Sequence, residues 1–169
     1  MQTRDAILKR RSIRKYKDTP IPKELILELL NAADAAPSAC NRRPLKFYVI
    51  RNKDILRALG ESGRFTSFPA PLSIVVAGDM TKTLPRSFAD YWVHDAGAAT
   101  ENILLMATDL GLGACWCGVH LQPDAMERVR SLLSLPENII PFSLIKIGYP
   151  DEEREAHGEY DPMHVEFVD

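Results

Sequence analysis

The chain has 169 residues, of which 46% are hydrophobic and 26% are charged, and its formal net charge is −2. This length and composition predict a single globular domain, residues 1–169, and exclude an intrinsically disordered chain. The apolar runs are too short to cross a membrane, so no membrane partner is expected, and the N-terminus lacks the apolar core of a signal peptide.

Charge is distributed unevenly along the chain. Residues 1–17 contain seven Lys or Arg against one acid, whereas residues 151–169 contain eight acids against one Arg. A nucleic-acid-binding protein would carry a broad basic face, so we expect no nucleic-acid partner and a local anion site instead. Cys40, Cys115 and Cys117 are an odd number, and the last two are too close for an easy disulfide, which favours reduced thiols and a cytoplasmic location.

The first half of the chain predicts alternating helices and strands. A short helix is predicted over residues 3–12, with Ile7 and Leu8 on its apolar side. Leu and Ala recur at helical spacing over residues 23–35, and Pro22 suits the first position of this helix. The following segments predict a strand at 47–50, a helix at 54–59, a loop at 60–71 and a nearly continuously apolar, buried strand at 72–78.

The second half begins with a long helix, predicted from Ser87, a favourable N-cap residue, to Leu110, with Gly111 as its C-terminal stop. Small residues at its centre allow another helix to approach closely, either within the chain or from a second subunit. Residues 111–120 are strand-like, Pro123 begins a further helix, and residues 142–147 predict the last strand. Residues beyond 150 show no strong period, which predicts an extended arm or a loosely attached tail.

Residues 9–16, Lys-Arg-Arg-Ser-Ile-Arg-Lys-Tyr, concentrate cations and one hydroxyl. Guanidinium groups and a short hydroxyl donor suit a phosphate monoester because they form bidentate, charge-assisted hydrogen bonds. A solvated basic face is the alternative interpretation of this run by itself. Residues 36–44 form a second unusual segment, a loop rich in small polar residues between a predicted helix and a predicted strand, which alone would be an ordinary loop.

The order of four motifs resembles the FMN-dependent nitroreductase family over nearly the whole chain. The motifs occupy residues 10–16, 36–41, 111–118 and 147–150. The resemblance implies an α+β fold with a central, mostly antiparallel sheet flanked by helices. It also implies a homodimer with FMN bound at the subunit interface and a C-terminal arm, from about residue 150 to 169, that embraces the partner.

The resemblance assigns the FMN contacts to ten residues: Arg10, Arg11, Ser12, Arg14, Pro37, Ser38, Ala39, Asn41, Arg43 and Gly118. The first four match positions that hold the phosphate and the ribityl chain. The loop residues match a segment that lies on the flavin from the neighbouring subunit, and the backbone N–H of Gly118 would point at flavin N5. No catalytic side chain is implied, because the flavin performs the chemistry. NAD(P)H would donate electrons, and a nitroaromatic, a quinone or a similar small acceptor would take them in a ping-pong reaction.

Two positions depart from the family pattern. Arg43 stands where many relatives have Gln, and it would reach the polar edge of the flavin, a substrate anion or only water. After Pro150 many relatives supply a pair of cations for the phosphate, and here Arg154 and His157 are the candidates.

Other interpretations are open for single features and for the whole chain. Cys115, Cys117 and His120 have metal-ligand chemistry, but a structural zinc site needs four ligands and no fourth is evident, so no metal is predicted. His94 and Asp95 could form an acid–base pair, although adjacent helical residues do not face each other. The alternative functions are a flavin-binding carrier or sensor without efficient turnover, and a small anion-binding module without flavin.

Overall fold

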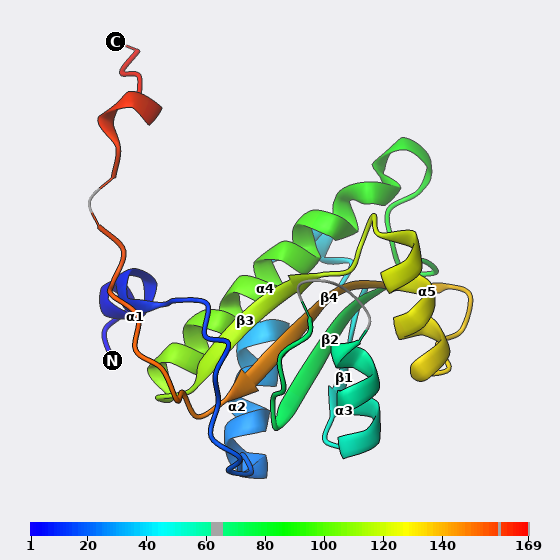
Figure 1. Cartoon of the computed structure of the whole chain (residues 1–169). Helices are drawn as coiled ribbons and strands as arrows, with labels where there is room; N and C mark the ends of the chain where they lie inside the picture. Colours follow the sequence, from blue (N-terminus) through cyan, green and yellow to red (C-terminus); the bar gives the residue numbers. More distant parts are fainter. Residues whose placement is uncertain (62–65, 159, 169) are drawn as a thin grey trace.

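A four-stranded antiparallel sheet forms the centre of the computed structural model, which describes residues 1–61, 66–158 and 160–168 (Figure 1). The strands are β1 (Leu45–Ile50), β2 (Leu72–Asp79), β3 (Gly113–Gly118) and β4 (Ile139–Gly148), in the order β1-β2-β4-β3. The predicted α+β fold with an antiparallel sheet is therefore confirmed.

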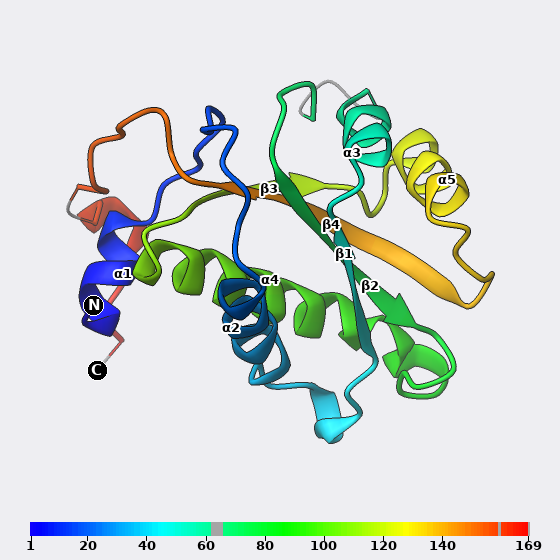
Figure 2. The same cartoon turned by 90° about the horizontal axis from the view of Figure 1, so that it is seen from below.

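Helices cover both faces of the sheet (Figures 1 and 2). On one face lie α2 (Lys23–Asp34) and α4 (Trp92–Asp109), and on the other lie α3 (Lys53–Gly60) and α5 (Pro123–Leu132). The first helix, α1 (Thr3–Lys9), packs beside α4, and short 3-10 helices occupy Ala39–Asn41, Arg86–Tyr91 and Pro162–His164. In the described segments, no helix has the length and apolar character to cross a bilayer.

Two hydrophobic cores form because the central strand β2 is buried on both faces. Successive strand residues point to opposite faces. Ile74 and Val76 pack in the core with α2 and α4, whereas Val75 and Ala77 pack in the core with α3 and α5. Since all eight residues of β2 are buried, its sequence is apolar on both faces instead of alternating, apart from Ser73 and the terminal Asp79.

The predicted end of the first helix is wrong. α1 ends at Lys9 instead of residue 12, because the chain from Ser12 onward pairs with β3, where the Ile13 N–H donates to Ala114 O at 3.0 Å. Ile7 and Leu8 are exposed in this chain, so they do not form the buried side of the helix that their apolar character predicted.

The predicted start of the long helix is also wrong. Ser87 lies within the 3-10 helix that precedes α4, and α4 itself begins at Trp92 without a side-chain capping hydrogen bond. The Trp92 ring is buried and packs edge-on against His120 and Phe142, so tertiary packing sets this boundary. The other helices and strands occur where they were predicted, within a few residues at each end; of the loop predicted over 60–71, residues 62–65 lie outside the described residues.

Asp79, at the end of β2, is a buried carboxylate with several hydrogen bonds. Its Oδ1 accepts from Thr81 Oγ1 at 2.6 Å, from the Thr81 backbone N–H at 3.1 Å and from Asn138 Nδ2 at 2.9 Å. Lys46 Nζ lies 3.8 Å from Oδ2. The hydrogen bond from the Thr81 hydroxyl is the main cause that lowers the pKa of Asp79, and Asn138 and Lys46 act in the same direction.

Asp79→Asn is expected to lower the free energy of unfolding by about 1–2 kcal/mol at pH 7, because charge-assisted hydrogen bonds become neutral ones. Since the folded pKa lies below the unfolded value of about 3.9, this stabilisation is present above that value and is lost as the pH falls through the folded pKa. Urea unfolding between pH 7 and pH 3 should show the difference between wild type and variant shrinking in acid. Asp18→Asn, which removes an exposed carboxylate, is the control; a difference that stays constant with pH would contradict the prediction.

Candidate functional site

The basic segment, residues 10–16, lies in an extended conformation along the free edge of β3. Ser12 forms a parallel bridge with Ala114, and Ile13 packs onto the backbone of Gly113. A Cβ atom at position 113 would lie 2.8 Å from Cβ of Ile13, so glycine allows this close approach. The segment is thus held by the sheet, although it is not a regular strand itself.

Glu152, in the segment after β4, fixes the other end of the basic segment. Its Oε1 accepts the backbone N–H groups of Arg14 at 2.6 Å and Lys15 at 3.2 Å. Its Oε2 accepts from Nε and Nη2 of Arg154 at 3.2 Å and 2.9 Å. The hydrogen bond from the Arg14 N–H is the main cause that lowers the pKa of Glu152, so this carboxylate is ionised at neutral pH.

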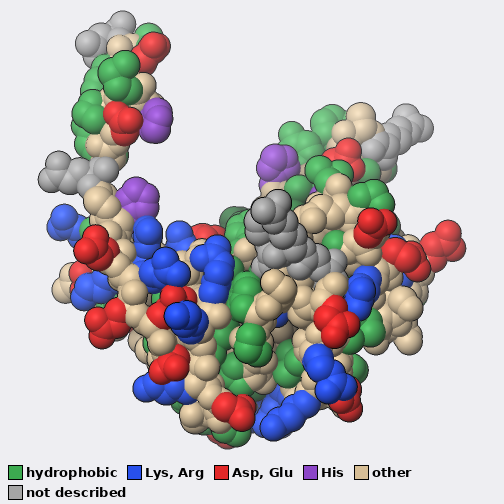
Figure 3. All heavy atoms as spheres, viewed as in Figure 1, with side chains coloured by type: hydrophobic (Ala, Val, Ile, Leu, Met, Phe, Trp, Pro, Cys, Tyr) green, Lys and Arg blue, Asp and Glu red, His purple; other side chains and the backbone are tan. Residues whose placement is uncertain are grey.

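The predicted phosphate-binding side chains differ in their present contacts. Arg10 Nε lies 3.2 Å from Glu101 Oε1 of α4. Arg11 is half-buried and Arg14 is exposed, and neither guanidinium forms an ion pair with any residue of the described chain. Lys and Arg side chains gather over this part of the surface (Figure 3). Two guanidinium groups beside Ser12 are therefore free to bind an anion.

Cys115 and Cys117 are two residues apart in β3, so their side chains point to the same face of the sheet. Both are buried there, on the face that packs against α3 and α5. A hydrogen bond from Cys117 is the main cause that lowers the pKa of Cys115 to about 7, and Arg14 and Ser12 act in the same direction. The same thiol–thiol contact raises the pKa of Cys117. Nowhere in the described chain do three or more Cys, His, Asp or Glu side chains gather in a way that could hold a metal ion.

The loop after α2 has a constrained backbone. Cys40, Asn41 and Arg43 have φ angles of 50°, 52° and 47°, a region that L residues rarely adopt. The Ala39 N–H donates to Asp95 Oδ1 at 2.9 Å, and Asp95 is buried near the start of α4. Strained backbone persists only where the surroundings impose it, and it is concentrated at functional sites.

Arg43 contacts its own loop. Its Nε donates to Asn41 Oδ1 at 3.1 Å, its Nη1 lies 3.8 Å from Asp34 Oδ2, and its backbone N–H donates to Ser38 Oγ at 3.0 Å. The side chain is exposed, and together with Pro37 and Ser38 it lines a small hollow. The loop therefore presents the amide of Asn41 and the guanidinium of Arg43 as one unit at the surface.

The two predicted segments do not meet within one chain. The loop at Ala39–Asn41 and the N-terminal segment lie on opposite sides of the molecule (Figure 2). Gly118 is exposed at the end of β3, four residues beyond the Ala114 position that pairs with Ser12. The rise of a strand places these two positions about 13 Å apart. The phosphate-binding candidates and Gly118 thus share one sheet edge, and the loop stands apart from them.

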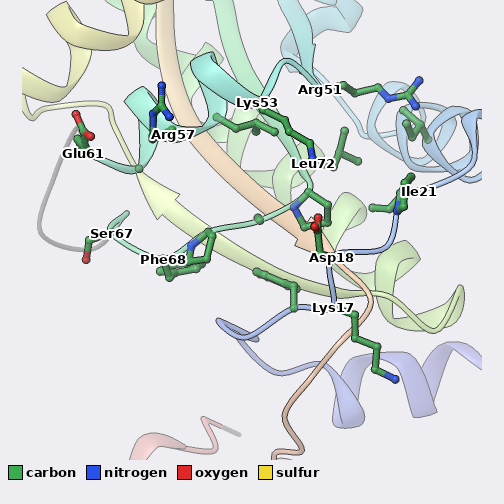
Figure 4. A pocket seen from close by; sticks show the side chains of 18 residues that line it. Lys17, Asp18, Ile21, Arg51, Lys53, Arg57, Glu61, Ser67, Phe68 and Leu72 are labelled. Carbon is green, nitrogen blue, oxygen red and sulfur yellow. The ribbon is translucent and has the colours of Figure 1, made fainter.

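A groove of about 910 Å³ begins at Tyr16, the last residue of the basic segment, and lies between α3, the loop before β2 and the chain that follows Tyr16 (Figure 4). Phe68, Leu72 and Ile21 form part of its wall, with Arg51 and Lys53 among its cations. None of the ten predicted FMN residues lines it. The chemistry of the side chains, and not the size of this groove, therefore indicates the candidate site.

Comparison with known proteins identifies the family. The sequence model of the Nitroreductase family matches residues 7–64 and 63–149. The chain belongs to the nitroreductase family. A protein of Methanothermobacter thermautotrophicus, provisionally named NADH dehydrogenase/NAD(P)H nitroreductase, is 42% identical over 170 residues, which cover 98% of this chain and 87% of that protein.

Two solved structures of nitroreductases resemble this chain closely. An FMN-dependent nitroreductase from Clostridium difficile has a TM-score of 0.87 and 36% identity, covering 97% of this chain and 98% of that one. A protein from Desulfovibrio desulfuricans, provisionally described as a nitroreductase and solved in complex with FMN, has a TM-score of 0.84 and 28% identity, covering 100% of this chain and 98% of that one.

The contacts of three acids with the candidate site residues were missed in the sequence. Asp95 holds the loop and does not pair with His94, whose exposed ring lies 5.6 Å from that of Tyr91. Glu101 binds Arg10, and Glu152 binds the backbone of the basic segment. Their only sequence signal is that they are acids, in a chain that has 23 of them.

Proposed function

We propose that this nitroreductase is an FMN-dependent NAD(P)H oxidoreductase that reduces small oxidised acceptors such as nitroaromatics or quinones. Its family and its named relatives make it an oxidoreductase. The observation that carries the FMN assignment is the sheet edge on which Arg14, exposed and without an ion pair in the described chain, lies beside Ser12 and which ends at the exposed backbone of Gly118. Cations and a hydroxyl suit a phosphate, and an open glycine suits a flat ring.

The protein's own residues would supply binding and orientation. Arg10, Arg11, Ser12 and Arg14 would hold the phosphate and ribityl chain, and the Gly118 N–H would be directed at the ring. FMN, when bound, would supply the redox chemistry by taking a hydride from NAD(P)H and passing electrons to the acceptor. Because donor and acceptor would use the same open position in turn, ping-pong kinetics are expected.

We further propose a homodimer, because the two halves of the predicted site lie apart in one chain. A second copy would bring its Pro37, Ser38, Ala39 and Asn41 to the sheet edge of the first. The C-terminal segment extends away from the body of the chain (Figure 1), and Phe167 and Val168 are 86% and 92% exposed. Large apolar side chains exposed together mark an interaction surface, which supports an arm, from about residue 150 to 169, that embraces the partner.

Truncation after residue 158 is expected to weaken the dimer by at least 100-fold, since the apolar side chains lost with the arm would each contribute about 1.5–3 kcal/mol when buried. Sedimentation over a range of concentrations would measure the dissociation constant. Phe167→Ser combined with Val168→Ser keeps the chain length and should reproduce most of the effect. A truncated protein that dissociates no more readily than the full chain would rule out a role for the arm.

The experiment that tests the function is a visible absorption spectrum of the purified protein, followed by anaerobic addition of NADH and then NADPH. A flavin spectrum that bleaches and returns when a quinone or nitroaromatic is added is the expected result. Bound flavin that neither nucleotide bleaches would favour a carrier or sensor. A protein that takes up no FMN but binds phosphate esters would favour a small anion-binding module.

We also propose that residues 1–169 act as one domain in the cytoplasm. Both predicted segments of the site contact the same helix, α4, through Arg10 and Ala39. In the described chain Cys40, Cys115 and Cys117 are not joined in disulfides, which suits a reducing compartment.

A further inference from the structure

Glu152 stands at the end of a short backbone pairing that joins two distant parts of the chain. The Lys17 N–H donates to Tyr149 O at 2.9 Å, and the Asp151 N–H donates to Lys15 O at 2.9 Å. The next residue along, Glu152, then turns its carboxylate onto the N–H groups of Arg14 and Lys15. The Glu152 side chain is only 13% exposed. The hydrogen bond of Asp151 on one side, and those from Arg14 and Lys15 on the other, fix its position.

The second oxygen of the same carboxylate fixes the orientation of Arg154. Nε and Nη2 both point to Oε2, at 3.2 Å and 2.9 Å. A guanidinium has five N–H donors, so three remain for another acceptor. The Arg154 side chain is 49% exposed, and these donors are therefore accessible from solvent.

His157 differs from Arg154 in this respect. Its ring Nδ1 lies 3.1 Å from Gly158 O, and its backbone N–H donates to Leu8 O of α1 at 3.0 Å. Of the two C-terminal candidates, Arg154 is thus the one joined through a single carboxylate to the backbone of Arg14.

We propose that Glu152 is a positioning residue for the FMN phosphate: one carboxylate oxygen holds the backbone of Arg14 and Lys15, and the other orients the guanidinium of Arg154, one of the two C-terminal phosphate candidates. This proposal rests on the proposed FMN function and adds a residue that has the wrong charge for phosphate binding. Glu152 acts by preorganisation: the Arg154 guanidinium and the end of the basic segment at Arg14 and Lys15 are already fixed before the anion arrives, which removes part of the entropic cost of binding.

The test compares flavin binding by Glu152→Gln and Glu153→Gln in flavin-free full-length protein. Both substitutions remove one negative charge at neighbouring positions, but Glu153 is exposed and has no hydrogen-bond or ion-pair partner in the described chain. If charge alone mattered, both variants would bind FMN slightly more tightly than wild type. We expect Glu152→Gln to bind FMN about 10-fold more weakly, the loss of one charge-assisted contact, and Glu153→Gln to bind it at least as tightly as wild type.

Riboflavin, which lacks the phosphate, separates positioning from a general structural effect. Its dissociation constant should change less than about twofold in Glu152→Gln, since riboflavin lacks the phosphate that Arg14 and Arg154 would bind. Arg154→Ala should weaken FMN binding to a similar extent, and the double variant should be no weaker than either single variant because the two residues act as one unit.

Three results would overturn the role of Glu152. These are FMN binding by Glu152→Gln that equals that of Glu153→Gln, equal losses of FMN and riboflavin, or additive losses in the double variant. If wild-type protein binds neither flavin, the proposed function fails as well, whereas wild-type binding with an unaffected Glu152→Gln overturns only this inference.

Discussion

Arg14→Ala is expected to weaken FMN binding by about 10- to 100-fold without unfolding the protein. A hydrogen bond to a charged group contributes about 1.5–3 kcal/mol, and each 1.4 kcal/mol corresponds to a factor of ten in the dissociation constant. The Arg14 side chain is exposed and forms no ion pair in the described chain, so its removal leaves no charge buried without a partner. The contact from the Arg14 backbone N–H to Glu152 is independent of the side chain and should persist.

Quenching of FMN fluorescence during titration with flavin-free protein would measure the affinity of wild type and variant. Arg51→Ala is the matched control, because Arg51 is also an exposed arginine but lines the 910 Å³ groove instead of the sheet edge. The affinity of wild type should fall with added salt more steeply than that of Arg14→Ala, since the variant has lost a cation that binds the phosphate. Equal affinities of Arg14→Ala and Arg51→Ala would remove Arg14 from the site.

Local sequence patterns were sufficient to predict the helices and strands in which the apolar residues of the pattern are also the buried ones. The helical spacing over residues 23–35 corresponds to α2, where Leu29 and Ala33 are buried. The apolar run over 72–78 corresponds to β2, which is covered on both faces. In both cases the same side chains that give the periodicity also form the core, so propensity and packing favour one structure.

Elements whose boundaries depend on distant contacts could not be predicted in this way. The residues after Lys9 continue a helical pattern, but pairing with Ala114 makes them extended. Ser87 is a good N-cap residue, yet the burial of Trp92 against Phe142 sets the start of α4. Intrinsic helix preferences are worth less than about 1 kcal/mol per residue, and tertiary contacts override them.

The candidate site also combines residues that the sequence indicates with residues that only the fold reveals. The cations and the hydroxyl were visible in the sequence because they cluster within a few residues of one another. The acids that hold them were not visible, because Glu152 is 138 residues from Arg14, and Asp95 is 56 residues from Ala39. A pairing over such a distance has no local signature, so it needs the fold to reveal it.

Gly78→Ala is expected to lower the free energy of unfolding by about 1–3 kcal/mol. A Cβ atom at position 78 would lie 2.4 Å from Cε3 of Trp92 and 2.7 Å from Cε of Met80. Met80 can move, but the Trp92 ring is buried between α4 and the sheet, so strand and helix would have to separate. Overpacking of this kind costs about 1–3 kcal/mol and occasionally more. Urea unfolding followed by circular dichroism would measure it, and an unchanged midpoint would contradict the prediction.

Gly118→Ala is the same chemical change with the opposite expected outcome. Among the described residues, a Cβ atom there would meet only Nε2 of Gln122, at 3.5 Å, which is an ordinary contact. The free energy of unfolding should therefore change by less than about 0.5 kcal/mol. If the backbone of Gly118 approaches the flavin, the added methyl group would occupy that space, and reduction of bound FMN by NAD(P)H should slow at least tenfold. Stopped-flow bleaching of the flavin would measure the rate. Slower bleaching would indicate that the ligand, and not the packing of the chain, requires glycine at this position. Unchanged bleaching would place the flavin elsewhere on the sheet edge.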